Sequence, residues 1–342
     1  MFASSRSAGH NGTMYFSLSA GKVRGLQLIS GAGGRFTMAA MDHRGSLEHE
    51  LCAVSGQGCY NDMVDFKMDL CAALAPHASA VLLDPIYGAA QAISRDVLPK
   101  SAGLLVSIEA TGYQGDQTAR RSRLLDGWGV AKIKRLGASA VKMLIYFRPD
   151  SGDLAADQLA LVAKVAAECR QLDIPFLVEP VSYQLHGENA ATFASKKTSI
   201  VVETARLMTG LPIDVLKAEF PADVGLISND EALTDACCRL DAASSKPWVI
   251  LSGGASYEVF RRQVEFACRA GASGFLAGRA LWQEAVAIDN RIERRRFLET
   301  VAARRLIEIA AIAETFGRPW YQKMGAAKDQ LFEVDAEWYR NY

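Results

Sequence analysis

The sequence lacks the features that would point to a membrane or a nucleic acid as its main partner. No hydrophobic run reaches the ~18 residues that a transmembrane helix requires. Basic and acidic side chains balance at 38 each in the 342-residue chain, so no strongly basic surface is indicated. The N-terminal stretch MFASSRSAGHNGT is polar and contains no apolar signal-peptide core. We therefore expect a cytoplasmic protein with no nucleic-acid or membrane partner, and a loose or disordered tail over residues 1–16.

Motifs for metal binding and redox chemistry are missing as well. The chain has seven cysteines, an odd number, and no two of them form a CxxC pair. Most lie in segments rich in alanine and leucine, which favours reduced cysteines in a protein core. The five histidines show none of the spacings that are typical of a metal site. We therefore expect no metal and no other cofactor.

Eight short apolar runs alternate with longer segments, several of them of helical periodicity. The runs are FTMAAMD (36–42), SAVLLDP (79–85), GLLVSIE (103–109), AVKMLIYF (140–147), PFLVEPVS (175–182), VLKAEFP (215–221), WVILSGG (248–254) and GFLAGR (274–279). Such alternation is typical of a parallel sheet, and eight units in about 250 residues match an α/β fold, the closed (β/α)8 TIM barrel. The rival is an open, doubly wound sheet, which usually carries a GxGxxG turn after its first strand, and that turn is absent.

The chain after Arg279 indicates a helical extension. Residues 291–317 combine charges with an apolar stripe, and residues 320–342 are rich in aromatic side chains. We predict one domain over residues 17–342, a barrel followed by C-terminal helices. The aromatic end suits either the cover of a barrel end or a contact between subunits, and we expect a homo-oligomer of undefined size.

Polar residues gather along and after the predicted strands. In a barrel, the C-terminal ends of the strands form the mouth that carries the active site. The residues found there are Asp42, His43, Arg44, Asp84, Glu109, Lys142, Tyr146, Arg148, Glu179, Lys217, Glu219, Ser252, Gly253, Gly254, Gly278 and Arg279. Isolated buried charges cost several kcal/mol each, so this convergence favours a functional site over packing alone.

Two lysines inside predicted strands, Lys142 and Lys217, are the most informative members of this set. A buried lysine beside another cation can be a neutral amine near pH 7 and attack a carbonyl to form a Schiff base. The iminium withdraws electrons, so a neighbouring carbon–carbon bond can break or form. Glu179 would then move protons as a general acid and base. The alternative is architectural, because Lys217 and Glu219 share one face of a strand and would suit a structural ion pair.

Two glycine-rich turns lead into helices after the last two strands. Their sequences are LSGGAS and LAGRALW, and they supply Ser252, Gly253, Gly254, Gly278 and Arg279. Backbone N–H groups in such turns bind anions, and in barrels this pair of loops often holds phosphate. The alternative is a pair of ordinary tight turns.

A long polar connection over residues 112–128 follows the third predicted strand. It contains Arg120, Arg121 and Arg123. Its composition fits either a lid over the substrate or an exposed loop with solvated arginines.

Seven stretches in order along residues 17–320 resemble the tagatose-1,6-bisphosphate aldolase family, which includes the sulfofructose-phosphate aldolases. They are LSAGKVRGLQLIS, MAAMDHRGSL, VLLDPIYG, AVKMLIYF, FLVEPVSY, VLKAEFP and WVILSGGASYEVFRRQVEFACRAGASGFLAGRALWQEAV. The resemblance implies a class I aldolase on a (β/α)8 barrel, with Lys217 as the Schiff-base lysine and Glu179 as the catalytic carboxylate. It implies that Lys142 and Asp42 surround the hydroxyl and carbonyl groups of the substrate. The residues that it implies for phosphate binding are Ser252, Gly253, Gly278 and Arg279.

The chain departs from the family at one position. A lysine usually follows the strand-3 glutamate in an EKTGY-like stretch, whereas this chain reads EATGY with Ala110 in that place. The departure affects a substrate contact and leaves the Schiff-base chemistry untouched.

We therefore expect a class I aldolase that cleaves a ketose 1,6-bisphosphate, such as tagatose 1,6-bisphosphate, into dihydroxyacetone phosphate and glyceraldehyde 3-phosphate. Arg44 and Glu109 complete the predicted substrate contacts. One alternative is a sulfofructose 1-phosphate aldolase that gives dihydroxyacetone phosphate and sulfolactaldehyde, because the sequence does not distinguish a C6 phosphate from a C6 sulfonate or define the stereochemistry of the sugar. A second alternative is a sugar-phosphate-binding barrel without aldolase activity, either an isomerase or a regulator.

Overall fold

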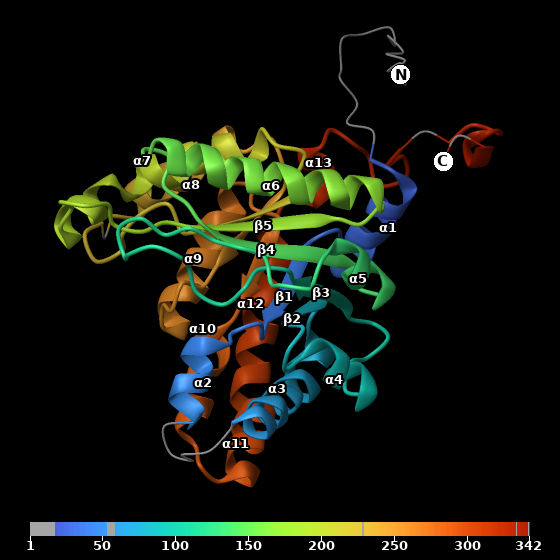
Figure 1. Ribbon diagram of the computed structural model, residues 1–342, viewed down its shortest axis with the longest axis vertical. Coiled ribbons are helices and arrows are strands. Elements are labelled where there is room, and N and C mark those ends of the chain that lie inside the picture. Colours follow the sequence, from blue (N-terminus) through green and yellow to red (C-terminus); the bar gives the residue numbers. More distant parts are fainter. Residues whose placement is uncertain (1–17, 53–58, 228, 333, 341) are drawn as a thin grey trace, which may run out of the picture.

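Eight parallel strands close into a barrel in the computed structural model of the protein (Figure 1). Each strand pairs with the next one along the chain, and β1 closes the ring by pairing with β8. The residues that the structure describes are 18–52, 59–227, 229–332, 334–340 and 342. The tail predicted over residues 1–16 lies outside them.

The eight strands coincide with the eight predicted apolar runs. They are β1 (Phe36–Ala40), β2 (Ala80–Leu83), β3 (Gly103–Ser107), β4 (Ala140–Tyr146), β5 (Phe176–Val181), β6 (Val215–Ala218), β7 (Trp248–Leu251) and β8 (Gly274–Ala277). The prediction of a (β/α)8 barrel is thus confirmed, and the open sheet is excluded because β1 and β8 are paired.

Helices follow the strands and surround the barrel. They are α1 (Ala20–Ile29), α2 (Gly45–Cys52), α3 (Tyr60–Leu74), α4 (Ala89–Ser94), α5 (Val130–Arg135), α6 (Asp153–Gln171), α7 (Ala190–Thr209), α8 (Asp230–Ala243), α9 (Tyr257–Ala270), α10 (Arg279–Trp282), α11 (Arg291–Phe297), α12 (Ala303–Phe316) and α13 (Trp320–Lys323). Helix α9 illustrates how the sequence sets their limits. The side chain of Ser256 caps its N-terminus, and Gly271, with a φ of 119°, ends it in the left-handed conformation that glycine adopts readily.

The alternation of side chains along each strand decides what enters the barrel. Successive side chains of a strand point to opposite faces. Leu177 of β5 and Val215 of β6 belong to the apolar cluster inside the barrel, and their immediate neighbours belong to the layer under the helices. Glu179 and Lys217 lie two positions further along these strands. Both side chains therefore point into the barrel, above an apolar floor.

The predicted C-terminal helices are confirmed and pack on the outside of the barrel. Helix α12 contacts α9 and β1, and a single π-helical turn (Leu298–Ala302) between α11 and α12 contacts α3. Arg291 of α11 forms ion pairs with Asp65 and Asp69 of α3. The arginine-rich face of α11 therefore anchors the extension to the first part of the chain.

The cysteines differ from expectation at two positions, Cys59 and Cys238, of which Cys238 is a free thiol but exposed. Cys71, Cys169, Cys237 and Cys268 are buried free thiols, as predicted. Cys59 is disulfide-bonded, so the prediction of reduced cysteines is wrong there. The absence of a CxxC pair says nothing about cysteines that are further apart in sequence. Of the helices in the described ranges, none combines the length and the apolar character needed to cross a bilayer.

Candidate active site at the barrel mouth

A pocket of about 440 Å³ lies at the C-terminal ends of the strands. It brings together all eleven predicted site residues, namely Asp42, Arg44, Glu109, Lys142, Glu179, Lys217, Ser252, Gly253, Gly254, Gly278 and Arg279. Three of them lie in the strands β4, β5 and β6, and the others lie in the segments that follow β1, β3, β7 and β8. The closed ring of strands is what makes residues up to 237 positions apart neighbours.

Lys142 of β4 lies at the centre of a cluster of three carboxylates. Its Nζ atom is 2.6 Å from Asp42 Oδ2, 2.9 Å from Glu109 Oε1 and 2.9 Å from a Glu179 oxygen. The residue is only 1% exposed. Burial alone would lower the pKa of Lys142, but the carboxylates outweigh it, Asp42 first, and hold the pKa well above its usual value. Lys142 is therefore a permanent cation of the site.

Glu179 of β5 links the two lysines. Its Oε2 atom contacts Lys142 at 2.9 Å, and its Oε1 atom contacts Nζ of Lys217 at 2.7 Å. Burial would raise the pKa of Glu179, but Lys142 and then Lys217 oppose it and bring the pKa below its usual value. An ionised carboxylate thus places one oxygen against each lysine nitrogen, which is a geometry suited to passing a proton to or from Lys217.

Arg44 and Glu109 carry polar atoms that the protein leaves unused. Arg44 donates from Nη2 to the backbone oxygen of Glu109 at 2.9 Å, and the same nitrogen lies 3.6 Å from Glu109 Oε1. Among the described residues, neither Nη1 of Arg44 nor Oε2 of Glu109 has a hydrogen-bond partner, although both atoms are buried. A buried donor and acceptor without partners are costly, so their position in the pocket wall suits polar ligand groups.

The turns after β7 and β8 form one continuous edge of the pocket. Gly253 and Gly254 have φ values of 56° and 81°, which glycine adopts at little cost. The hydroxyl of Ser252 accepts a hydrogen bond from the Gly278 N–H at 3.4 Å and so joins the two turns. The guanidinium of Arg279 lies beside Gly254. This edge combines accessible backbone with one arginine, as an anion site requires.

His43, expected at the mouth, lies in the pocket, although its lack of metal-ligand spacing gave it no predicted role. Its ring packs edge-on against Trp282 with 5.2 Å between centroids, and its buried Nδ1 has no hydrogen-bond partner in the described part of the chain. Burial lowers the pKa of His43 to about 4, although Asp42 opposes the shift. The imidazole is therefore neutral near pH 7. The sequence feature that indicated this location is the position of His43 between Asp42 and Arg44, two predicted site residues.

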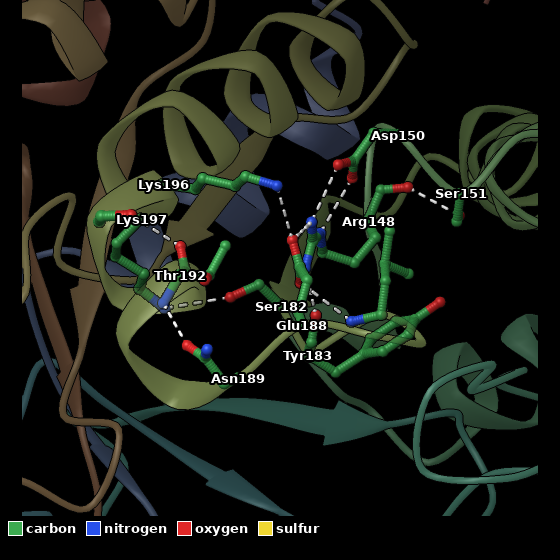
Figure 2. A network of polar contacts seen from close by, with 12 residues as sticks. Arg148, Asp150, Ser151, Ser182, Tyr183, Glu188, Asn189, Thr192, Lys196 and Lys197 are labelled. Atoms are coloured by element: carbon green, nitrogen blue, oxygen red, sulfur yellow. Dashed lines mark hydrogen bonds and ion pairs between the residues drawn. The ribbon is translucent and has the colours of Figure 1, made fainter.

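Two residues predicted at the strand ends point away from the pocket. Asp84, after β2, forms a fully buried ion pair with Lys67 of α3. Arg148, after β4, is held between Asp150 and Glu188, as Figure 2 shows. Both are structural, because a residue beyond the strand end no longer has to follow the alternation that directs strand residues inward.

Glu219 lines the pocket but does not pair with Lys217. Strand β6 ends at Ala218, so Glu219 leaves the strand geometry. Its carboxylate forms an ion pair with Lys197 of α7 and accepts a hydrogen bond from the Ser182 N–H at 2.9 Å. The alternative of a structural Lys217–Glu219 pair is therefore wrong, and Lys217 contacts Glu179 instead.

No group of three or more histidine, cysteine, aspartate or glutamate side chains suited to a metal ion occurs within the described residues.

Known proteins resemble this chain along most of its length. A family model described as "DeoC/LacD family aldolase" matches residues 36–284. Tagatose 1,6-diphosphate aldolase 2 of Streptococcus mutans is 30% identical over 328 residues, which cover 90% of this chain and 98% of the relative. Tagatose 1,6-diphosphate aldolase of Listeria monocytogenes is 30% identical over 335 residues, which cover 90% of this chain and 96% of the relative.

Two solved structures have a similar fold at low sequence identity. An archaeal fructose 1,6-bisphosphate aldolase superimposes with a TM-score of 0.58 at 18% identity and covers 85% of this chain and 98% of its own. A fructose-bisphosphate aldolase from Slackia heliotrinireducens gives a TM-score of 0.61 at 16% identity, with 86% and 89% covered.

Proposed function

Because the chain belongs to the DeoC/LacD aldolase family, as its resemblance to tagatose-1,6-bisphosphate aldolases predicted, we propose that it is a class I aldolase for a ketose 1,6-bisphosphate. The observation that carries this proposal is the shared carboxylate of Glu179, which contacts both Lys142 and Lys217 inside the pocket. The substrate that we propose is tagatose 1,6-bisphosphate or a closely related ketose. Its products are dihydroxyacetone phosphate and glyceraldehyde 3-phosphate.

Lys217 is the nucleophile in this proposal. Its amine adds to the C2 carbonyl of the open-chain ketose and forms a carbinolamine, which loses water to give an iminium ion. Glu179, 2.7 Å from Nζ, takes one proton from the amino group, and a second N–H proton passes to the former carbonyl oxygen as the carbinolamine forms. Glu179 then returns the first proton to this hydroxyl, which leaves as water. The first of these transfers therefore moves a proton between two groups that are already in contact.

Cleavage follows from the iminium ion. The C3–C4 bond breaks, its electron pair passes to the iminium nitrogen as an enamine, and the C4 hydroxyl proton passes to a carboxylate, for which Glu179 is our candidate. The aldehyde leaves first. Protonation of the enamine at C3 and addition of water then release dihydroxyacetone phosphate and free Lys217.

The remaining pocket residues hold the substrate in this proposal. Ser252, Gly253, Gly254, Gly278 and Arg279 bind the C1 phosphate. The permanent cation of Lys142 and the carboxylate of Asp42 bind the oxygens between C2 and C4, while Arg44 and Glu109 supply their unused polar atoms to the sugar hydroxyls.

Borohydride trapping tests the chemistry directly. Incubation with dihydroxyacetone phosphate and reduction should add the mass of that ketose minus one oxygen atom, and peptide mapping should find the adduct on Lys217. Lys217→Ala should abolish the adduct and aldol cleavage, whereas Lys164→Met, a change at an exposed position of α6, should retain both. Absence of an adduct in the wild type, or an adduct on another lysine, would reject the proposal. An isomerase would keep its activity in Lys217→Ala.

We further propose that the described barrel and its extension fold as one domain over residues 17–342, and that the protein acts in the cytoplasm as a homo-oligomer. Trp338, Tyr339 and Tyr342 near the C-terminus are 42–61% exposed, which suits a contact between subunits. Charged sugar phosphates do not cross membranes unaided, which favours the compartment of sugar metabolism. Light scattering measures the oligomeric state.

A further inference from the structure

The proposed function leaves the second anionic end of the substrate without a binding site. In a closed ring of eight strands, β3 lies across the barrel from β7, and β4 lies across from β8. A ketose whose C1 phosphate is bound at the turns after β7 and β8 therefore extends toward the loops that follow β3 and β4. A binding site at these loops for the second anionic end rests on the proposed function.

The connection between β3 and α5 is a folded hairpin at this side. Ala110 donates its N–H to the Arg123 carbonyl at 2.9 Å, and Gln114 and Arg121 exchange two backbone hydrogen bonds of 2.8 Å. Thr111 and Gly112, at the start of the hairpin, line the pocket. The segment predicted as either a lid or a solvated loop is therefore an ordered flap whose base forms part of the pocket wall.

Only one of the three arginines on this hairpin lacks a carboxylate partner in the described ranges. Arg121 forms an ion pair with Asp157 at 2.5 Å, and Arg123 lies 4.0 Å from Asp126. Arg120 makes no ion pair there, and its Nε donates to the Gln117 carbonyl at 3.0 Å. Its positive charge is therefore not cancelled by a neighbouring side chain.

Arg120 is instead surrounded by three tyrosine rings. Its guanidinium carbon lies 4.8 Å from the ring centroid of Tyr113, 5.3 Å from that of Tyr146 and 5.6 Å from that of Tyr183. These rings come from the hairpin, from the end of β4 and from the segment after β5, and the Tyr146 ring lines the pocket. Aromatic faces attract a cation without neutralising it.

The buried Arg148 fixes one wall of this tyrosine cage. Its Nη1 donates to the backbone carbonyl of Tyr183 at 2.7 Å, and its guanidinium is locked by Asp150 and Glu188 (Figure 2). The cage therefore holds Arg120 beside the pocket in a defined position.

The charges of the pocket wall point to the same residue. Four cations, Arg44, Lys142, Lys217 and Arg279, line the pocket together with four carboxylates, Asp42, Glu109, Glu179 and Glu219. The formal charges of these side chains therefore cancel. Three of these cations contact carboxylates, and Arg279 is the exception among the described contacts. Among the described residues in and beside the pocket, a doubly anionic substrate then finds two arginines without a carboxylate partner, Arg279 by β8 and Arg120 on the opposite side.

We propose that Arg120 is the specificity-determining residue that binds the anionic group on C6 of the ketose. A planar guanidinium donates two parallel hydrogen bonds to a phosphate or a sulfonate, whose oxygen geometry matches it. Arg44 is less suited to this role, since its guanidinium lies against Glu109.

Kinetics with paired substrates tests this role. We compare a ketose 1,6-bisphosphate, the 6-sulfonate analogue and the ketose 1-phosphate in the wild type and in Arg120→Met. Loss of one charged hydrogen-bonding partner should lower kcat/KM about 10- to 100-fold for the substrates with an anion on C6, mainly through KM. The 1-phosphate should be cleaved with unchanged kcat/KM. Arg120→Lys should restore part of the loss, and Arg123→Met on the same hairpin should behave like the wild type.

Two outcomes would overturn the inference. One is an equal effect of Arg120→Met on substrates with and without the C6 anion, and the other is no effect on either. If the wild type prefers the 6-phosphate or the 6-sulfonate substrate, and Arg120→Met no longer shows this preference, the preferred anion is the natural group on C6.

A binding measurement separates this inference from the proposed function. A hexitol 1,6-bisphosphate has no carbonyl and cannot form a Schiff base. Calorimetry should show it binding about 10- to 100-fold more weakly to Arg120→Met than to the wild type, and a hexitol 1-phosphate binding equally to both. Failure of borohydride trapping rejects the aldolase, whereas equal loss for both hexitols rejects the role of Arg120.

Discussion

Replacing Lys142 with methionine tests whether this ammonium group holds the pocket together. It contacts the carboxylates of Asp42, Glu109 and Glu179 at 2.6–2.9 Å in a position that is 1% exposed. Methionine keeps an unbranched apolar chain but leaves three carboxylates without the cation that they share. Removing one partner of a buried ion pair typically costs about 3–5 kcal/mol, and we expect a loss of this size in the free energy of unfolding near pH 7.

The loss should depend on pH in a defined direction. In the wild type, burial would raise the pKa of Asp42 and Glu179, but Lys142, followed by Lys217, holds both below their usual values. Without Lys142, the effect of burial dominates, and the pKa values of Asp42 and Glu179 in the folded state rise above those in the unfolded chain. A raised carboxyl pKa stabilises the folded state below the unfolded pKa, and this contribution disappears as the pH rises through the folded pKa. Compared with the wild type, Lys142→Met should therefore lose most of its free energy of unfolding near pH 7, and the loss should become smaller toward pH 4.

Urea unfolding of the wild type, Lys142→Met and Lys164→Met at pH 7 and pH 5 provides the measurement. The exposed Lys164 has no ion-pair partner within the described residues, and its variant should stay within about 0.5 kcal/mol of the wild type. An equal loss for Lys142→Met at both pH values would assign the cost to packing. A loss below about 1 kcal/mol near pH 7 would refute the argument, because it falls short of the cost of an uncompensated buried charge.

Two further substitutions test a residue of the pocket and a contact between strands of the barrel. His43→Gln removes an imidazole whose pKa is lowered to about 4 by burial. The unfolded chain then binds more protons than the folded one between pH 6.5 and 4, so wild-type stability should fall by up to about 3 kcal/mol across this window. The variant should lose that slope in urea titrations, and parallel slopes would contradict the assignment. Gly274→Ala places a Cβ 1.9 Å from the Phe36 backbone oxygen, whereas a Cβ at Gly127 meets nothing within 4 Å. Thermal unfolding should show a loss above about 3 kcal/mol for the first and about 1 kcal/mol for Gly127→Ala, and similar losses would count against the β1–β8 contact.

The strands and the inward direction of the key side chains could be predicted from the sequence. Short apolar runs mark all eight strands. Strict alternation then places Glu179 and Lys217 on the same face as the interior residues Leu177 and Val215. Both inferences depend on local pattern alone, which is why they agree with the structure.

The partners of these side chains could not be predicted, because they depend on register between strands. The pairing of β4 with β5 sets Leu144 opposite Glu179, and this offset brings the carboxylate to Lys142. No pattern within one strand contains that offset. The end of β6 at Ala218 is equally non-local, and it is what sends Glu219 to Lys197.

Different residues of the pocket are suited to proton transfer and to anion binding. At the centre, Lys142 and Lys217 form ion pairs with carboxylates, which balance their positive charges. If Lys217 is the nucleophile, as we propose, such a centre passes protons to it without attracting the phosphates of the substrate onto it. Two arginines in and beside the pocket have no carboxylate partner within the described residues: Arg279, after β8, lines the pocket, and Arg120, on the β3–α5 hairpin, lies against the pocket residue Tyr146. In our proposal, a ligand with two anionic ends is thus drawn across the barrel, so that the carbons between its ends lie over Lys217.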